Sequence, residues 1–226
     1  MIGFHYFLAK WFDNIFLLNC MSVMKINDKI YDIKESVVFS KTTGQFGGLS
    51  NMAAGYSLFV NEVNIANSEI LYQCCRFPLF PKLQQDIIAI ENPMEAKTIA
   101  RKHDNYSRQD WEDIKVDMMR WCLRVKLVQN FDKFSKLLKE TENKAIVEYS
   151  AKDSFWGAMP TEKGKLQGKN VLGRLLMELR ETVVKQNDKI ESVSPLTIPA
   201  FLLFNFPIEA VHSTEYSIED LDNVYA

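Results

Sequence analysis

The sequence predicts a mainly α-helical fold with a few short strands, built as one compact domain. The 226 residues suffice for one well-buried core, and 47% apolar and 25% charged residues are ordinary values for a globular protein. Several segments carry apolar residues at helical spacing, whereas the alternating pattern of strands is concentrated near the start of the chain. These observations favour helices packed around one core.

The first segment raises the question of a signal peptide or a membrane anchor, because residues 1–23 are largely apolar. No basic region precedes the apolar run, and Lys10 and Asp13 interrupt it, so neither is predicted. Translation starting at Met21 or Met24 is an alternative to an ordered amphipathic N-terminal extension. We therefore expect a cytoplasmic protein that does not bind membranes.

The rest of the chain divides into a main domain over residues 24–190 and a C-terminal extension over residues 191–226. Within residues 24–66, alternating runs and the glycine cluster TGQFGGLSN predict two or three short strands around a loop at residues 42–51. The C-terminal extension carries the apolar run PLTIPAFLLFNFP. We expect this run to pack back on the main domain before an acidic, poorly ordered tail.

The predicted helices begin at recognisable capping signals. Asn67 or Ser68 can cap a short helix that the following prolines end. Ser107, with Asp110 three residues later, predicts the start of the longest helix. The further helices are expected over residues 93–102, 108–130, 132–141 and 171–187, with an irregular connection around AKDSFWGAMP before the last.

Charge and cysteine content exclude several classes of protein. A net charge of −2 gives no overall attraction to a polyanion, which disfavours an architectural nucleic-acid binder but leaves room for local basic contacts. The cysteines form no CxxC pair and the three histidines lie far apart, so neither a zinc site nor a disulfide framework is predicted. We expect a reducing compartment, no cofactor, and hydrolysis carried by carboxylates if there is any.

Three polar residues share one face of the short helix after Asn67. Glu69, Gln73 and Arg76 recur at i, i+4 and i+7, and the opposite face is apolar. By spacing alone, such a face is more often a solvated surface. The functional alternative is a carboxylate held beside fixed donors, where it can stabilise positive charge or transfer a proton.

Two lysines on the long helix project in nearly the same direction. Lys115 and Lys126 lie eleven residues apart, about three turns, with Trp111 nearby. Such lysines more often extend from the edge of a core toward solvent. A desolvated lysine can instead attack an opened sugar aldehyde or bind a diphosphate.

The connection KDSFWG places Asp153 three residues before Trp156, with Glu148 just upstream. An acid beside an aromatic ring is a common lining for a pocket that binds a base or a sugar. Capping of a turn by Asp153 and core packing of Trp156 are equally acceptable explanations. The pattern alone does not decide between them.

Gly168, Asn170 and Gly173 open the last predicted helix, and glycines at a helix start let a phosphate approach backbone N–H groups. Lys169 and Arg174 strengthen this hypothesis modestly. No clear strand precedes the motif, so it is neither a Walker nor a Rossmann fingerprint. Tight packing through glycine is at least as good an explanation.

These patterns occur together in an order that resembles the NADAR, or YbiA-like, family. The resemblance runs from about Val38 to Glu181, and its motifs are FSKTTGQFGGLSNM, NSEILYQCCRFP, AKTIARK, DWEDIKVDMMRWCLRVKLVQN, IVEYSAKDSFWGAM and GKNVLGRLLMELR. It implies a compact, mainly helical domain over residues 24–190 that hydrolyses N-glycosidic bonds without a metal or cofactor.

The resemblance implies two alternative substrate classes. One is the phosphorylated ribosylaminopyrimidine intermediates of riboflavin biosynthesis, and the other is ADP-ribose attached to guanine bases of nucleic acid. Members of the second group resemble antitoxins that reverse the action of an ADP-ribosyltransferase toxin. The first group usually reads EHxxQxxKF, whereas Arg76 replaces that lysine here, which favours ADP-ribosylguanine. A non-catalytic module that binds ADP-ribose or a similar small molecule is a further alternative.

Site residues follow from the resemblance position by position. It implies catalytic roles for Glu69, Asp153 and Lys126, the last through a Schiff base with the opened sugar as an alternative to carboxylate catalysis. The residues expected to bind substrate are Gly48, Ser50, Asn51, Gln73, Arg76, Trp111, Lys115, Trp156, Gly157, Gly168 and Asn170. No metal ligand is expected.

Overall fold

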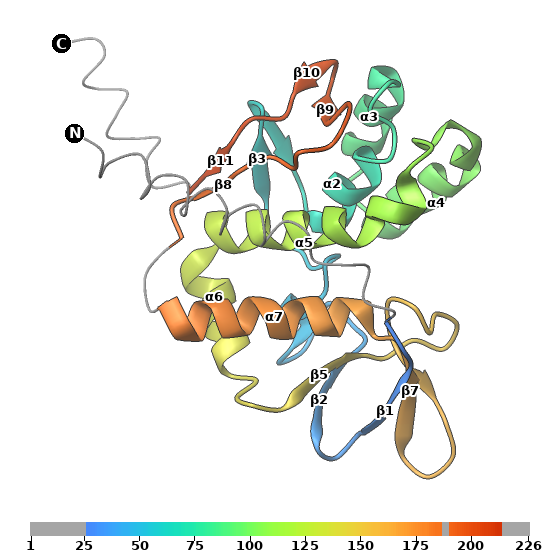
Figure 1. The fold of residues 1–226 in the computed structure, drawn as a ribbon, viewed down its shortest axis with the longest axis vertical. Helices are drawn as coiled ribbons and strands as arrows, with labels where there is room; N and C mark the ends of the chain where they lie inside the picture. Colours follow the sequence, from blue (N-terminus) through green and yellow to red (C-terminus); the bar gives the residue numbers. More distant parts are fainter. Residues whose placement is uncertain (1–25, 187–189, 214–226) are drawn as a thin grey trace, which may run out of the picture.

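Two helices, α5 (Trp111–Gln129) and α7 (Val171–Gln186), run through the middle of the molecule in the computed structural model, which describes residues 26–186 and 190–213 (Figure 1). The other helices above and beside α5 are α2 (Ser68–Cys74), α3 (Pro81–Ile88), α4 (Pro93–Lys102) and α6 (Phe131–Lys139), with short 3₁₀ turns η1 (Gly47–Leu49) and η2 (Asp104–Tyr106). Helix α7 lies between α5 and a group of strands on its other side (Figure 1). The predicted mainly helical class is confirmed.

The strands below α7 form two small units. β1 (Lys29–Asp32), β7 (Lys165–Gly168) and β6 (Met159–Pro160) make an antiparallel sheet, and β2 (Ser36–Phe39) pairs in parallel with β5 (Ala145–Glu148). The remaining pairs are antiparallel: β3 (Leu58–Val60) with β4 (Val63–Ile65), β8 (Ser192–Val193) with β11 (Val211–His212), and β9 (Leu202–Leu203) with β10 (Phe206–Pro207). Residues 26–66 thus contain four strands, not two or three.

Two elements differ from the sequence-based expectation. Helix α3 is additional: Pro81 was expected to end a helix, but it stands in the first turn of a new one, where its missing N–H costs nothing. Strand β7 directly precedes the glycine-containing start of α7, where no strand was expected. Because β7 is antiparallel to both neighbours, it is still not part of a Rossmann-type βαβ unit.

The long helix begins at Trp111 and not at Arg108. The Asp110 carboxylate accepts hydrogen bonds from Arg108 Nε at 2.6 Å and Nη2 at 3.0 Å. This contact lowers the pKa of Asp110 below its ordinary value. Arg108 is thereby fixed outside the helix, and Trp111 becomes the first helical residue.

The core lies on both sides of α5. Met118, Cys122 and Val125 are fully buried on this helix, while Val37 of β2 and Ile146 of β5 pack below α7. Adding a layer of short strands buries α7 on the side away from α5. Helix α2 packs against both α4 and α5.

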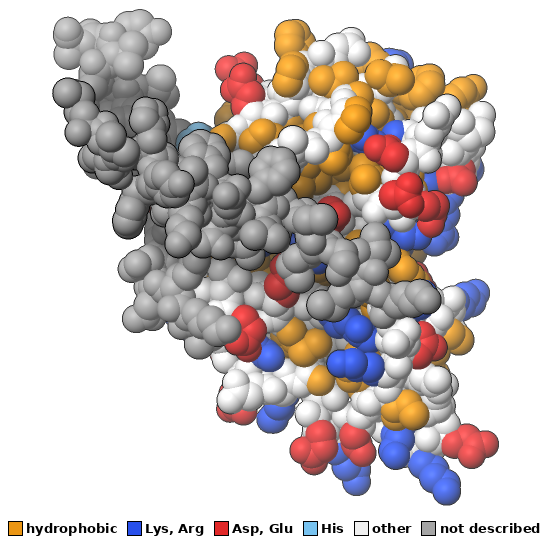
Figure 2. Space-filling model, viewed as in Figure 1, with side chains coloured by type: hydrophobic (Ala, Val, Ile, Leu, Met, Phe, Trp, Pro, Cys, Tyr) orange, Lys and Arg blue, Asp and Glu red, His pale blue; other side chains and the backbone are white. Residues whose placement is uncertain are grey.

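The C-terminal segment packs on α5. Trp121 contacts the Phe201 ring at 4.9 Å between centroids, and its Nε1 donates to the Ser194 carbonyl at 3.0 Å. Figure 2 shows hydrophobic side chains gathered over the part of the surface where β10 and α3 lie; Phe206 and Leu79 are both 70% exposed. The acidic tail expected at the end of the chain and the extension over residues 1–23 lie outside the described residues.

Within residues 26–186 and 190–213, none of the helices is both long and apolar enough to span a membrane. Cys74, Cys75 and Cys122 are free and buried, and Cys20 lies outside the described part of the chain.

Candidate functional site

The start of α2 carries a buried carboxylate with fixed donors. Asn67 caps the helix, since its Oδ1 accepts from the Ile70 N–H at 3.1 Å. Glu69 is only 2% exposed; Gln73 Nε2 donates to its Oε1 at 2.7 Å, and Asn51 Nδ2 donates to its Oε2. Lys97 of α4 adds a positive charge 3.9 Å from Oε1. The geometry suits an ionised carboxylate whose orientation is determined by two amides.

Arg76 extends this polar network toward η2. Its guanidinium donates to Ser107 Oγ at 3.0 Å and to Gln73 Oε1 at 3.4 Å, pairs with Asp104, and lies 5.2 Å from the Trp111 ring centroid. Glu69, Gln73 and Arg76 are at most 9% exposed. The three residues therefore form an interior network and not a solvated surface. Arg76 was expected on the same helical face, but α2 ends at Cys74 and Arg76 lies just beyond it.

An aromatic wall adjoins the network. Tyr72 lies between Trp111, at 4.9 Å between ring centroids, and Trp156, at 5.7 Å. Burial, followed by the nearby Glu69 carboxylate, raises the pKa of Tyr72 well above its ordinary value. The two tryptophans predicted from distant segments are thus brought together by a tyrosine that the prediction did not include.

Glu148 and Asp153 reach the same region from the other side. Glu148 ends β5, and the charges of Lys97, Glu69 and Asp153 all act on it. Asp153 Oδ1 accepts from the backbone N–H groups of Phe155 and Trp156, both at 2.9 Å, so this carboxylate caps the turn that presents Trp156. The structure places three carboxylates and Lys97 in one cluster.

Three side chains in this cluster and wall lie outside the predicted set: Tyr72, Lys97 and Glu148. Tyr72 is three residues after Glu69, so helical spacing could have identified it. Lys97 lies in the motif AKTIARK, and Glu148 precedes the aromatic connection, but nothing in their local sequence indicates that they meet Glu69. Only the tertiary fold reveals the cluster, because it packs α4 against α2 and brings Glu148 close enough for the charges of Glu69 and Lys97 to act on it.

Lys126 supports the loop that contacts Glu69. Its side chain is 1% exposed, and its Nζ donates to the carbonyls of Gly48 at 2.6 Å and Ser50 at 2.9 Å. The ammonium also lies 4.2 Å from the Tyr56 ring and 4.3 Å from the Phe134 ring, and burial lowers the pKa of Lys126 well below its ordinary value. Asn51 follows directly in this loop and also accepts the Glu69 N–H at 3.0 Å.

Lys115 lies beside the aromatic connection, away from Lys126. Its ammonium is 4.5 Å from the Phe155 ring centroid and is paired with Glu112. Lys169 lies 5.4 Å from the same ring. Phe155 therefore has two lysines near it, next to Trp156.

The start of α7 packs against the aromatic connection. Backbone N–H groups of residues 169–172 donate to the carbonyls of Ser154, Gly157, Phe155 and Trp156, respectively. A Cβ on Gly157 would lie 2.6 Å from the Glu148 carbonyl, and one on Gly168 would lie 2.6 Å from the Gly157 carbonyl. The Asn170 side chain bonds to the Ile146 carbonyl at 2.8 Å. Because these N–H groups already donate to protein carbonyls, they are not available to a phosphate. Close packing therefore accounts for the glycines.

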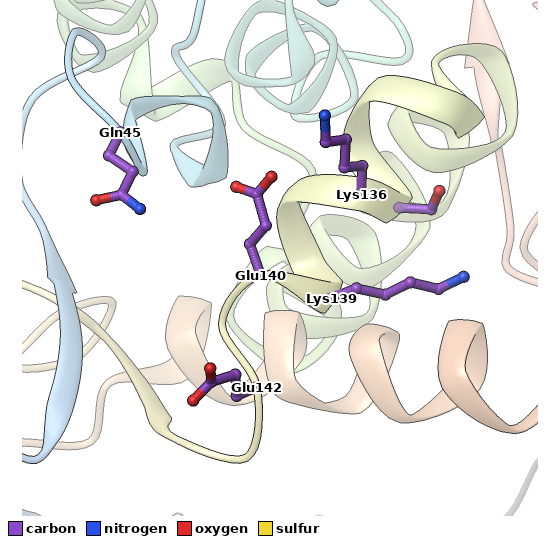
Figure 3. A pocket seen from close by; sticks show the side chains of 6 residues that line it. Gln45, Lys136, Lys139, Glu140 and Glu142 are labelled. Atoms are coloured by element: carbon purple, nitrogen blue, oxygen red, sulfur yellow. The ribbon is translucent and has the colours of Figure 1, made fainter.

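Among the described residues, no group of three or more His, Cys, Asp or Glu side chains has the arrangement of a metal site. A hollow of about 570 Å³ lies elsewhere, between the η1 region and the end of α6 (Figure 3). It is lined by Gln45, Ser135, Lys136, Lys139, Glu140 and Glu142. It includes none of the predicted site residues.

Comparison with known proteins gives consistent results. A model of the NADAR domain family matches residues 37–184. N-glycosidase YbiA of Escherichia coli is 35% identical over 143 residues, covering 63% of this chain and 85% of that protein. A riboflavin biosynthesis protein of Vibrio vulnificus is 32% identical over 156 residues, covering 67% of this chain and 41% of that protein. The NMR structure of the E. coli protein YbiA, 32% identical, has a TM-score of 0.58 and covers 68% of this chain and 88% of that one.

Proposed function

The chain belongs to the NADAR family, and on that premise we propose that it is an N-glycoside hydrolase that removes ADP-ribose from guanine bases of nucleic acid. The buried Glu69 carboxylate, oriented by Asn51 and Gln73, carries the proposal. N-glycosidase activity is supported by the relatives that bear this name. ADP-ribosylguanine as the substrate rests on Arg76, at the position where the riboflavin group usually has lysine.

Glu69 fits the electrostatic demand of the reaction. Breaking a ribosyl C–N bond builds positive charge at the anomeric carbon, and a preorganised anion stabilises that charge. Because the two amides already orient the carboxylate, it needs little rearrangement in the transition state. The wall of Trp111, Tyr72 and Trp156 supplies ring surfaces against which a base or a ribose can pack. No metal is part of the proposed mechanism.

The phosphates of the substrate are assigned to the lysines beside Phe155. Lys115 and Lys169 approach this ring from α5 and from the start of α7. Arg76 is not assigned to the phosphates, because Asp104, Ser107 and Gln73 already bind its guanidinium. We assign Arg76 to orienting Gln73 and Trp111.

Lys126 acts, in this proposal, by orienting the loop that carries Asn51. Its ammonium already has two carbonyl acceptors and two aromatic faces. The competing route is a Schiff base between Lys126 and the opened sugar. Borohydride trapping of an enzyme–substrate adduct that disappears in Lys126→Ala would favour the Schiff base, and absence of an adduct under turnover would favour orientation.

A second candidate substrate is a phosphorylated ribosylaminopyrimidine of riboflavin biosynthesis. The similarity to the Vibrio vulnificus riboflavin biosynthesis protein favours it. The test is to offer the purified protein both an ADP-ribosylguanine oligonucleotide and the ribosylaminopyrimidine, and to compare kcat/KM. Faster release of ADP-ribose supports the first proposal, and faster cleavage of the pyrimidine intermediate replaces it with the second.

A module that binds ADP-ribose without cleaving it is the remaining alternative. If the wild type cleaves neither substrate while both it and Glu69→Gln bind ADP-ribose, the enzyme proposal is wrong. The antitoxin role predicts a functional partner, an ADP-ribosyltransferase toxin whose product this protein would reverse. Restoration of growth in cells that express such a toxin, lost in Glu69→Gln, would test that role.

A further inference from the structure

Glu148 occupies a rigid position at the end of β5. Its N–H donates to Asn170 Oδ1 at 3.0 Å, and its carbonyl accepts from the Ala158 N–H at 2.8 Å. Gly157 packs closely against the same carbonyl, since a Cβ at Gly157 would lie 2.6 Å from it. Hydrogen bonds and close packing thus hold the backbone of Glu148 in place. The point from which its side chain extends is therefore fixed.

The Glu148 carboxyl group differs from the other carboxylates of the cluster. No residue in the described part of the chain donates a hydrogen bond to it, whereas Glu69 has two amide donors and Asp153 has two backbone donors. The charged groups that act on Glu148 are Glu69 on α2, Asp153 in the aromatic connection and Lys97 on α4. Its hydrogen-bonding capacity is therefore free for a ligand.

This environment favours a protonated carboxyl group near neutral pH. Burial raises the pKa of Glu148 to about 7; the Lys97 charge opposes this effect, and the carboxylates of Glu69 and Asp153 reinforce it. Two neighbouring acids in unlike environments are the usual basis for dividing acid and base roles. Glu69, with two amide donors, is suited to act as the anion. Glu148, with a raised pKa and no donor among the described residues, is suited to act as the proton donor.

We propose that Glu148 is the general acid of the N-glycosidase reaction, an assignment that rests on the proposed function. As the C1′–N bond breaks, its electron pair moves to the leaving nitrogen, and the Glu148 O–H gives its proton to that nitrogen. Water then adds to C1′ and releases a proton to Glu69. Exchange with solvent returns Glu69 to the anion and Glu148 to the acid, so the net reaction consumes one water.

The experiment compares the wild type, Glu148→Gln and the control Glu162→Gln, an exposed residue between β6 and β7. The substrate is whichever N-glycoside the wild type cleaves in the comparison above. We expect kcat in Glu148→Gln to fall by about 10²- to 10⁴-fold, the usual contribution of a general acid. The wild type should lose activity as the pH rises through about 7, because its acid deprotonates. This alkaline limb should be absent from Glu148→Gln and unchanged in Glu162→Gln.

A second variant separates proton donation from a structural role. Glu148→Asp keeps an ionisable group, so it should retain an alkaline limb at a reduced rate even if Glu148→Gln folds poorly. Wild-type kcat and pH profile in Glu148→Gln would overturn the assignment, and so would a lower kcat with the alkaline limb intact. A wild type that cleaves neither substrate overturns the proposed function itself, which distinguishes that failure from failure of the Glu148 assignment.

Discussion

The first turns of α2 and α7 were both candidates for substrate binding, and they act differently in the structure. Each is a helix start with a polar motif that predicts substrate binding. At α2, side chains meet inside the protein, and the Glu69 carboxylate faces Asn51, Gln73 and Lys97. At α7, backbone N–H groups bind the carbonyls of residues 154–157, and small residues allow close packing. The first start contributes chemistry, and the second holds the aromatic connection in place.

The difference shows what decides the use of a helix start. Free N–H groups at an N-terminus attract anions, but only if no protein carbonyl reaches them first. In α7 the turn capped by Asp153 places its carbonyls on these groups. A glycine motif therefore predicts a phosphate site only together with knowledge of the segment that packs on it.

The largest effect should come from removing the charge at α2. Glu69→Gln keeps the size of the side chain and removes the anion that would stabilise the transition state. We expect kcat to fall by about 10³-fold or more. The melting temperature should fall only modestly, because the new amide still accepts one of the two hydrogen bonds that Asn51 and Gln73 donate to Glu69. Turnover assays with thermal unfolding measure both. Activity within tenfold of the wild type would show that α2, like α7, is only a scaffold.

At α7, the expected effect is on stability. A Cβ on Gly173 would lie 2.1 Å from the Ile146 carbonyl, so Gly173→Ala must push β5 away from the helix. We expect a loss of about 3 kcal/mol in the free energy of unfolding, the range of overpacked interiors. Urea denaturation checks this, with Thr182→Ala on the same helix as the control, expected to stay within about 0.5 kcal/mol of the wild type. An unchanged Gly173→Ala would mean that this helix start is not tightly packed.

Glu148, which lies between the two helix starts, should link stability to pH. In the folded protein the Glu148 carboxyl group has a pKa of about 7, whereas the ordinary pKa of a glutamate is 4.5. Folding therefore takes up a proton between these pH values, and the stability of the wild type falls as the pH rises through them. In Glu148→Gln this loss, about 2 to 3 kcal/mol, should vanish. Urea denaturation at pH 5 and pH 8 gives the difference; equal pH dependence in both proteins would contradict it.

The smallest effects distinguish two adjacent residues at α2. Ser68 Oγ is buried and has no hydrogen-bond partner among residues 26–186 and 190–213, so Ser68→Ala should raise the free energy of unfolding by up to about 1 kcal/mol. Asn67→Ala removes the side-chain oxygen that accepts the Ile70 N–H, so it should lower the free energy of unfolding by about 1 kcal/mol. Chemical denaturation of both variants tests these opposite signs. Destabilisation by Ser68→Ala would mean that its hydroxyl has a partner.

Long periodic segments were the predictable part of the fold. The helix at residues 93–102 was predicted with the bounds that the structure has, and the longest helix differs by a few residues because Arg108 is held by Asp110 outside it. Strands of two to four residues were mostly missed. β5 and β7 are too short for an alternating pattern to stand out, and they depend on pairing with distant strands.

The site was predictable where its residues share one element or one motif. Spacing placed Glu69, Gln73 and Arg76 on one face, but it could not show that this face is buried, because burial depends on how α4 and α5 pack against it. Glu148 had no local signal for its role. Its environment arises from charges on α2, on α4 and in a loop, which only the tertiary fold brings together.

Lys126 also has a consequence for the order of folding. Its acceptors, Ser50 and Gly48, lie 76 and 78 residues earlier in the chain. Contacts between such distant positions form late, because closing the intervening chain costs entropy before any contact repays it. The loop that orients Glu69 therefore cannot be completed by the first part of the chain alone. During synthesis or refolding, activity should return only after α5 has docked, later than the first helical signal.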